Sequence, residues 1–454
     1  MNFTRAQTFS RSPVTLLATL LAANVFAVEN WPQFRGPQAS GVSSGTAPTK
    51  WNAESGENIL WQTALPGLGH ASPIVWGDKI YIATAVRPGA KAELKVGLYG
   101  DGASYAEKER HQWRLLCVDK ATGKILWDKL ELEAVPRLER HTKATHCNST
   151  PATDGKRIVA MFGSEGVFCY DMNGAKIWSK DLGKLHAAPQ DMPSLQWGFA
   201  SSPVLYDGKV VVQVDTISEQ FLAVFDAVDG KELWRRPRKD NSSWCTPIVA
   251  KAAGRTQVIA NGWKEIGGYD FKSGEPLWWL SEGGDVPVAS PIVAGDSVIL
   301  TSGHGKFRPM RRVLLNATGD IKPAEISLTN EAVAWVHPRK GNYLQTPIVV
   351  GDKVWGCSND GIVTCFDLAS GKIYYEERIG GGGQGFTSSP VSAGGNLYFT
   401  GEQGDVFVIP VSDKFRVLAT NKLDGICLTT AAISDGAMFY RTTEKLLAIG
   451  VKKP

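Results

Sequence analysis

The chain has 454 residues, of which 21% are charged and 9% aromatic, and it contains 48 Gly and 15 Trp. This is an ordinary soluble globular composition tilted toward Gly and Trp. The formal net charge is only +4 and there is no long basic run, which excludes a typical nucleic-acid-binding protein.

The N-terminus has the pattern of a targeting segment. Arg5 and Arg11 precede a short apolar run, Val14–Ala23, and Val25–Ala27 resembles a small-residue cleavage site. The apolar run is too short to span a bilayer, and no Cys lies near the cleavage site to carry a lipid. We therefore expect a signal peptide over residues 1–27 and a periplasmic or secreted protein without a membrane span or lipid anchor.

After this segment, a hairpin phrase occurs eight times along the chain. Most copies have Pro at the start of an apolar run, a Gly-Asp or Asp-Gly turn, and a second apolar run, which is the pattern of a tight β-hairpin. The copies begin at Ser72, Ser149, Ser201, Cys245, Ser290, Thr346, Ser388 and Thr429.

A second phrase follows the first in most repeats and reads like VDKATGKILW. It predicts a strand end, an Asp-initiated turn containing Gly, and another strand that ends on an aromatic residue. Its copies are Val118–Trp127, Phe225–Trp234, Tyr269–Trp278, Phe366–Tyr375 and the shortened Tyr170–Trp178. A period of about 40–50 residues that carries only strand signals predicts a β-propeller, because one small sheet cannot bury both of its faces alone.

The repeats predict an all-β fold, an eight-bladed β-propeller with four antiparallel strands in each blade. The last repeat ends after three strands, and Asn58–Trp61 resembles the missing fourth. We expect this N-terminal strand to complete the last blade, because closing the ring removes exposed sheet edges. The predicted organisation is a signal peptide (1–27), an N-terminal extension (28–56) and a single propeller domain (57–454).

The aromatic residue that ends the second phrase is predicted to be structural. A large ring on an outer strand can pack against the neighbouring blade near a turn peptide, with its N–H satisfied locally. The residues concerned are Trp127, Trp178, Trp234, Trp278 and Tyr375. Two blades depart from the pattern, since 316–334 is an insertion before Trp335 and 411–419 contains no Trp.

Seven Cys is an odd number for an exported chain, so at least one thiol is expected to lack an intramolecular partner. Cys117, Cys169 and Cys365 hold equivalent positions and are interpreted as small buried apolar residues. The alternative is a disulfide between Cys357 and Cys365, which needs a bulged hairpin register.

Function is expected on the face of the propeller that carries the long loops, because binding residues concentrate on loops held by a rigid scaffold. All seven His are predicted to lie in these loops, together with Arg, Lys and aromatic residues, which suits an anionic, sugar-like or peptide partner. Solvated cations and rings packed under their own loops are the structural alternative. His141 and His146 do not have a zinc spacing, and no metal site is predicted. The candidate binding residues are His70, Arg140, His141, His146, His186, Trp197, Trp244, His304, Arg308, Arg311 and His337.

The phrase D-x-x-T-G-K-x-x-W at Asp119–Trp127 and its copies resemble the tryptophan-docking repeat of the pyrroloquinoline quinone (PQQ) propeller superfamily, over roughly residues 57–451. The segment Trp31–Gly41 resembles the start of secreted bacterial members. The resemblance implies one of two functions. One branch contains dehydrogenases that hold PQQ and Ca²⁺ in the channel and use an Asp base, often below a disulfide of adjacent Cys. The other branch contains a non-catalytic propeller of the outer-membrane assembly machinery.

This chain has no pair of adjacent Cys and no CxxCH haem site, and the calcium ligands and the base of the dehydrogenases are not assigned to any of its positions. The sequence therefore favours a non-catalytic, monomeric binding module with a protein, peptide or glycan partner on the long-loop face and no confidently predicted cofactor. The alternative is a PQQ- and Ca²⁺-dependent alcohol-type dehydrogenase, similar to polyvinyl-alcohol dehydrogenases. Fold alone does not decide between them.

Overall fold

The structure is a computed structural model that describes residues 1–2, 28–90, 93–97, 104–325 and 327–451. Apart from its first two residues, the predicted signal peptide lies outside the described residues. No helix among the described residues is long and apolar enough to cross a membrane.

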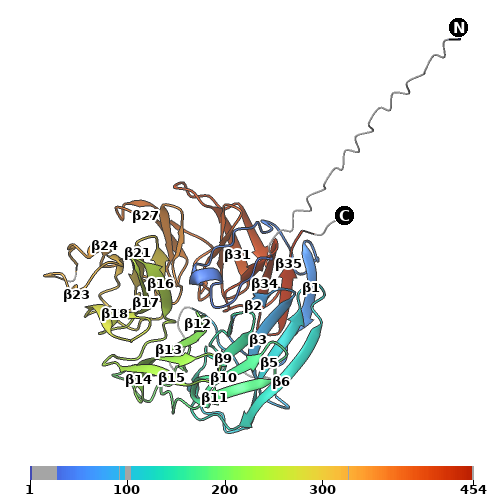
Figure 1. Cartoon of the computed structure of the whole chain (residues 1–454), viewed down its shortest axis with the longest axis horizontal. Helices are drawn as coiled ribbons and strands as arrows, with labels where there is room; N and C mark the ends of the chain where they lie inside the picture. Colours follow the sequence, from blue (N-terminus) through green and yellow to red (C-terminus); the bar gives the residue numbers. More distant parts are fainter. Residues whose placement is uncertain (3–27, 91–92, 98–103, 326, 452–454) are drawn as a thin grey trace.

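The described residues form eight four-stranded antiparallel blades arranged as a ring, which confirms the predicted eight-bladed propeller (Figure 1). The strands of blades 1 to 4 run from the channel outward as β2 (Ile74–Trp76), β3 (Lys79–Val86), β5 (His111–Asp119) and β6 (Ile125–Ala134); β8 (Ala152–Thr153), β9 (Arg157–Met161), β10 (Val167–Asp171) and β11 (Lys176–Lys180); β12 (Val204–Tyr206), β13 (Lys209–Asp215), β14 (Gln220–Asp226) and β15 (Glu232–Pro237); and β16 (Ile248–Ala252), β17 (Arg255–Ala260), β18 (Ile266–Asp270) and β19 (Pro276–Leu280).

Blade 8 is completed by the N-terminal strand β1, as the sequence predicts. The strands of blades 5 to 8 are β20 (Ile292–Ala294), β21 (Ser297–Thr301), β22 (Met310–Leu314) and β24 (Val333–His337); β25 (Ile348–Val350), β26 (Lys353–Cys357), β27 (Ile362–Asp367) and β28 (Ile373–Arg378); β29 (Val391–Ala393), β30 (Asn396–Thr400), β31 (Asp405–Pro410) and β32 (Ala419–Lys422); and β33 (Ala432–Ser434), β34 (Ala437–Arg441), β35 (Lys445–Ile449) and β1 (Ile59–Ala64). The shorter elements are the strands β4 (Ser104–Tyr105), β7 (Arg140–His141) and β23 (Gly319–Asp320) and the 3-10 helices η1 (Pro37–Ala39) and η2 (Gly163–Glu165).

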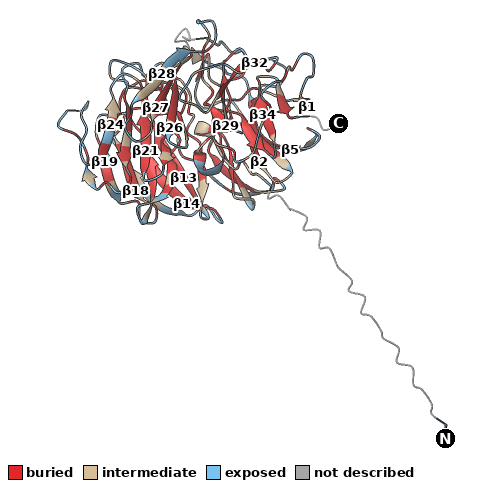
Figure 2. Cartoon of the chain, turned by 90° about the horizontal axis from the view of Figure 1, so that it is seen from above, coloured by how far each residue is buried: buried red, intermediate tan, exposed pale blue. Residues whose placement is uncertain are grey.

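The core lies between blades. The inner strands are buried on both faces, as in β13, where only the first residue is partly exposed (Figure 2). Each blade therefore packs its apolar residues against both neighbouring blades. The closed ring buries apolar surface that a single sheet would expose to water. The outer strands are more exposed, as in β15, where partly buried and exposed residues alternate.

The aromatic residue on an outer strand packs on the next blade's turn. The Trp61 ring lies against Gly123, and its indole N–H donates to the Lys120 carbonyl at 3.0 Å. Gly123 has a φ of +75°, and an added Cβ would come within 2.5 Å of that ring. Trp178 and Trp234 repeat the arrangement on the turns at Gly230 and Gly274.

The other three predicted docking residues make contacts that differ from this arrangement. Trp127 lies against Gly174 of the next blade. The Tyr375 hydroxyl instead accepts the Trp355 indole N–H at 2.8 Å. Trp278 donates to Gln257 inside its own blade at 2.8 Å.

The 316–334 insertion explains the neighbourhood of Trp278. It carries β23, which pairs in parallel with β19 and adds a fifth strand to blade 4. The insertion therefore covers the outer edge of the preceding blade.

All seven Cys are buried and free. Cys357 lies opposite Val363, and Cys365 lies opposite Trp355, so the two thiols do not face each other across the hairpin. The disulfide alternative is therefore wrong, and the cysteines act as small buried residues.

The N-terminal extension crosses the channel on the face that carries the tight turns. The Trp31 N–H donates to Val75 of blade 1 at 2.8 Å, and the Thr153 N–H of blade 2 donates to the Pro32 carbonyl at 2.8 Å. Further along, Ser43 donates to Ser392 of blade 7 at 2.8 Å. Figure 1 shows this blue segment with its short helix near the middle of the ring. The extension thus closes one end of the channel.

Candidate functional site

A cavity of about 430 Å³ opens in the channel on the long-loop face. Phe34 of the N-terminal extension lines it from the closed end, so the cavity is a dead end and not a tunnel. Five of the predicted binding residues line it: His70, His141, Trp197, Trp244 and His304.

Two tryptophans from neighbouring loops form part of the wall. The ring centroids of Trp197 and Trp244 are 5.3 Å apart. The Trp244 indole N–H donates to the Gly198 carbonyl at 2.8 Å, whereas the buried indole N–H of Trp197 has no partner among the described residues. Across the mouth, His304 packs on Tyr343 at 5.3 Å. Flat rings on a concave surface are suited to stacking on a planar or cyclic ligand group.

His70 is a neutral member of the wall. Its Nε2 contacts the Lys143 carbonyl at 2.8 Å and must carry the proton in that hydrogen bond. Burial, together with the nearby Arg441, Arg140 and Lys143 charges, lowers the pKa of His70 to about 4 although the carbonyl opposes this. Its imidazole therefore remains uncharged near neutral pH.

Lys143 is the cation that lines the cavity, and its ammonium pairs with Glu402 at 2.5 Å. The carboxylate of Glu402 is fully buried and also accepts the Gly97 N–H (2.8 Å) and the Thr387 hydroxyl (2.6 Å). The negative charge of Glu402 is thus satisfied behind the wall.

Arg140 and His146 lie in a separate cluster around Glu107. Arg140 donates to both oxygens of that carboxylate at 2.9 Å, and His146 Nε2 contacts it at 2.8 Å. Although burial opposes the shift, the hydrogen bonds from His146 and Arg140 lower the pKa of Glu107. Glu107, His111 and His146 have the atom types of a metal site within 4.8 Å. Because Arg140 occupies both carboxylate oxygens, the cluster is an ion-paired support for the loop.

The remaining predicted residues lie elsewhere. His186 bonds to the Pro193 carbonyl within its own loop, and Arg308 is exposed outside the cavity. Arg311 is buried in blade 5 beside Phe307, and burial lowers its pKa to about 10. His337 packs between Trp335 and Phe366, which places it in the contact between blades 5 and 6. The expected cationic surface at Arg308 and Arg311 is therefore not formed, because the register of β22 turns Arg311 inward.

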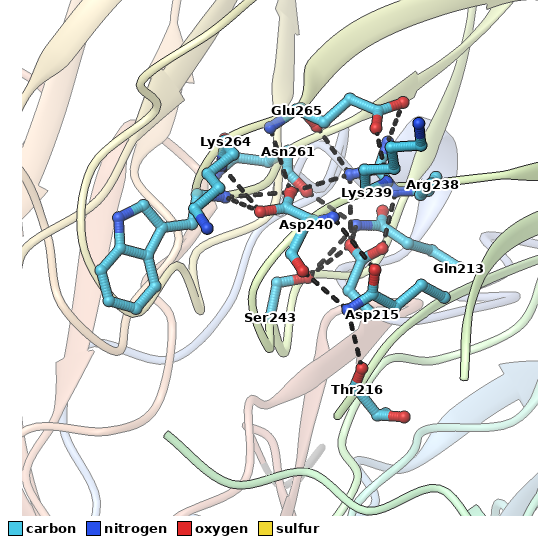
Figure 3. Close-up of polar contacts among 12 residues, drawn as sticks. Gln213, Asp215, Thr216, Arg238, Lys239, Asp240, Ser243, Asn261, Lys264 and Glu265 are labelled. Atoms are coloured by element: carbon cyan, nitrogen blue, oxygen red, sulfur yellow. Dashed lines mark hydrogen bonds and ion pairs between the residues drawn. The ribbon is translucent and has the colours of Figure 1, made fainter. Parts of the chain in front are cut away.

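A buried polar network around Asp215, Arg238 and Asp240, shown in Figure 3, supports the loop that leads to Trp244. Arg238 bonds to Asp215 at 2.6 Å and to Asp240 at 3.2 Å. Asp240 also accepts the backbone N–H groups of Asn241, Trp263, Lys264 and Glu265. Burial and the neighbouring Asp215 carboxylate raise the pKa of Asp240 to about 6. The Ser243 hydroxyl donates to Asp215 at 2.8 Å, which fixes the residue directly before Trp244.

A collar of eight hydroxyl groups surrounds the cavity, one from the start of each blade's innermost strand. In every blade the N–H of the collar residue donates to the hydroxyl of the next blade at 2.9–3.1 Å, and the chain of bonds closes on itself. The members are Ser72, Thr150, Ser202, Thr246, Ser290, Thr346, Ser389 and Thr430.

The collar was not predicted from the sequence, although the repeat contains a signal for it. Seven of the eight hairpin phrases place Ser or Thr directly before Pro, and the eighth has Thr430 before Ala431. A hydroxyl at one repeat position in a closed ring must meet its equivalents around the axis.

The resemblance to quinoproteins implies Ca²⁺ in the channel, which requires suitable oxygen ligands in the cavity wall. Calcium is held mainly by carboxylate oxygens, with carbonyls and waters. No Asp or Glu is among the described residues that line the cavity, and Glu402 is engaged by Lys143. The donor set does not fit a calcium–quinone pair.

Comparisons with known proteins agree on the type of propeller. A family model described as outer membrane protein assembly factor BamB matches residues 111–377. A polyvinylalcohol dehydrogenase from Sphingopyxis sp. (strain 113P3) is 23% identical over 375 residues, which cover 72% of this chain and 50% of that protein. The chain therefore spans about half the length of this curated relative.

Solved structures show the same fold at low identity. BamB from Moraxella catarrhalis is 16% identical with a TM-score of 0.53, covering 81% of this chain and 98% of that chain. A europium-containing methanol dehydrogenase is 11% identical with a TM-score of 0.61, covering 93% and 89%. The computationally designed Ika8 protein is 11% identical with a TM-score of 0.50, covering 79% and 98%. At these identities the likeness concerns the fold.

Proposed function

The chain belongs to the propeller family described as outer membrane protein assembly factor BamB, and from this premise we propose that it is a non-catalytic binding protein. It seats a group of a protein, peptide or glycan in the dead-end cavity on its long-loop face. The observation that carries the proposal is the cavity itself, with two tryptophans in contact in its wall and no carboxylate among its described lining residues.

The lining supports binding over chemistry. The aromatic side chains offer flat apolar surface, and the hydroxyls offer hydrogen bonds. His70 is neutral and already bonded to the Lys143 carbonyl, so it has no free proton to transfer through Nε2. The Glu107, Asp215 and Asp240 carboxylates are held by Arg140 or Arg238 away from the lining.

The proposal is tested by retention of the protein on peptide and glycan arrays. The Trp197→Ala variant is expected to lose at least tenfold in affinity for any retained ligand, since stacking surface disappears. Trp279→Ala is the matched control, because that ring is 42% exposed and lies outside this cavity. Equal loss in both variants, or no loss in Trp197→Ala, would reject the cavity as the binding site.

The second candidate is a PQQ-dependent alcohol-type dehydrogenase, and the match to the polyvinylalcohol dehydrogenase is what favours it. It is tested by adding PQQ and Ca²⁺ to the purified protein and measuring the quinone absorbance and dye reduction with polyvinyl alcohol. We expect neither bound quinone nor turnover. A stoichiometric quinone spectrum with turnover would replace the first proposal by the second.

We further propose that residues 1–27 direct export, that residues 28–56 form an N-terminal extension, and that residues 57–454 form one monomeric propeller domain in the periplasm or outside the cell. The apolar N-terminal pattern supports the first point. The N-terminal sequence of the mature protein and its mass by light scattering test these statements directly.

A further inference from the structure

The collar hydroxyls have hydrogens that no described residue accepts. Each collar oxygen accepts the N–H of the preceding blade, and none of the eight donates to another described protein atom. Their residues are no more than 6% exposed, yet all eight line the cavity. A hydroxyl that has accepted one bond still has one hydrogen to donate. The collar is therefore a closed ring of unused donors.

Two buried guanidinium groups lie next to this ring without a carboxylate partner. Arg35 is 1% exposed and donates to the Thr346, Pro347 and Pro390 carbonyls at 2.8–3.2 Å. The first of these belongs to a collar residue, and the other two belong to residues that directly follow collar residues. Arg441 is also 1% exposed and donates to Ala71, which directly precedes the collar residue Ser72, at 3.2 Å.

Buried cations held only by neutral groups leave positive charge uncompensated. Among the described residues, Arg35 also donates to the Ala39 and Ser40 carbonyls, and Arg441 also donates to the Ala83 carbonyl and the Thr84 hydroxyl. Charge in a low-dielectric interior is stabilised when an opposite charge comes near. No Asp or Glu among the described residues lines the cavity to supply that charge.

From these observations we propose that the collar is an oxyanion site, which receives a carboxylate, either of a free small acid or at the end of a longer ligand. The inference rests on the proposed function and adds the chemical class of the group that enters the cavity. The collar donates several O–H bonds to the anionic oxygens, which are stronger than bonds to a neutral acceptor. Trp197 and Trp244 then stack on the part of the ligand that is attached to the carboxylate.

The test compares a carboxylic acid with its neutral amide and with a small inorganic anion. 3-Phenylpropionate, 3-phenylpropanamide and inorganic sulfate are titrated calorimetrically into the full protein in a chloride-poor buffer. We expect the carboxylate to bind at least tenfold more tightly than its amide. Sulfate binding equal to that of the acid would identify a site for free small oxyanions, and tighter binding of the acid would identify a site for the anionic end of a larger ligand.

Variants of the collar provide the second readout. Ser202→Ala removes one collar donor, and we expect phenylpropionate affinity to fall by about three- to tenfold. Ser149→Ala is the matched control, because that buried hydroxyl lies in the same strand-start phrase but donates to the Ser201 carbonyl at 2.8 Å and does not line the cavity. The control is expected to bind like the wild type. The same loss in both variants would overturn the assignment to the collar.

A crystal structure of the unaltered protein soaked in sodium bromide keeps the proposal testable if the variants fail to fold. We expect an anomalous peak within hydrogen-bonding distance of the collar hydroxyls. Equal affinity for acid and amide, or a collar holding ordered water only, would overturn the oxyanion site. A neutral ligand still lost on Trp197→Ala would then leave the proposed binding function standing, whereas no ligand of any kind in the cavity would reject both.

Discussion

At the scale of single residues, the proposed binding function depends on side chains whose charge state is set by burial. His70 lies in the cavity wall next to Lys143, Arg140 and Arg441, which all oppose a further positive charge. Burial is the main cause that lowers the pKa of His70 from 6.5 to about 4, and these three charges add to it. The uncharged imidazole makes the wall suitable for an apolar or anionic ligand. It does not place an acid catalyst beside that ligand.

The depressed pKa of His70 predicts a pH dependence of stability. Above pH 6.5 the imidazole is neutral in both states, whereas between pH 6.5 and about 4 only the unfolded chain takes up a proton. The free energy of unfolding should therefore fall as the pH is lowered through this window. Urea unfolding at stepped pH values measures it. His70→Gln can keep the bond to the Lys143 carbonyl and should show a shallower slope, and an unchanged slope would contradict the shifted pKa.

The network around Arg238 makes a second prediction at this scale. Asp240→Ala removes one of the three carboxylates that pair with Arg238 and the acceptor of four backbone N–H groups. We expect the free energy of unfolding to fall by about 3 kcal/mol, as for other broken buried pairs. Glu275→Ala, which breaks an exposed pair with Arg236, should cost less than about 1 kcal/mol. Denaturant unfolding of both variants checks the difference, and similar losses would show that burial is not the cause.

At the scale of elements, the contact between an outer-strand Trp and the next blade's turn is the repeated unit of cohesion. Trp61, Trp178 and Trp234 each place an indole over a Gly and donate to a carbonyl in that turn. The turn needs a positive φ and the ring needs the missing Cβ, so the Gly serves both requirements.

Because the Gly meets both requirements, a matched pair of variants can separate the cost of backbone strain from the cost of a clash with the ring. Gly123→Ala adds left-handed strain and a clash with Trp61, whereas Gly208→Ala, at a φ of +68°, has no atom within 4 Å of the added Cβ and adds strain alone. We expect Gly208→Ala to cost about 1 kcal/mol and Gly123→Ala at least about 1 kcal/mol more. Thermal unfolding of the two proteins measures the difference, and equal costs would mean that the ring does not need the open turn.

Some of the elements could be predicted from the sequence and others could not. The spacing of turns and aromatic residues was enough to predict eight blades and the role of β1, because those features follow from local turn chemistry and ring closure. It was not enough to place Trp278, whose position depends on an insertion that pairs with the preceding blade. The inward turn of Arg311 is set by strand register, which a loop assignment did not reveal.

The candidate site was predictable in part for the same reason. Five loop residues meet in the cavity because the long loops all converge on one face. The sequence shows the collar residues as a repeated Ser or Thr before Pro. It does not show that their hydroxyls form a ring, because the hydroxyls come together only when the last blade is closed on the first. The partnership of His146 with Glu107 and His111 joins residues 35–39 positions apart, and spacing alone does not indicate it.

At the scale of the whole molecule, the N-terminal extension decides whether the channel is a tunnel or a pocket. Its contacts reach blades 1, 2, 6 and 7, and Phe34 lines the closed end. The extension therefore ties distant blades together as well as forming the floor of the proposed site.

A chain that begins at Thr46 should keep β1 and the ring but lose this floor. We expect a lower midpoint of thermal unfolding and loss of phenylpropionate binding, because Phe34 and Arg35 are gone. A chain that begins at Leu65 also lacks β1 and should fail to give a monodisperse monomer, since blade 8 then has an open edge. Circular dichroism and light scattering distinguish the two outcomes. An intact ring in the shorter chain would contradict the role of β1.

The central claim is that the dead-end cavity is where this propeller binds its ligand. A crystallographic fragment screen on the unaltered protein tests it most directly. We expect bound fragments to gather between Trp197, Trp244 and the collar, and we expect fragments that carry a carboxylate to point it at the collar hydroxyls. Fragments that leave this cavity empty while occupying other surfaces would contradict the claim.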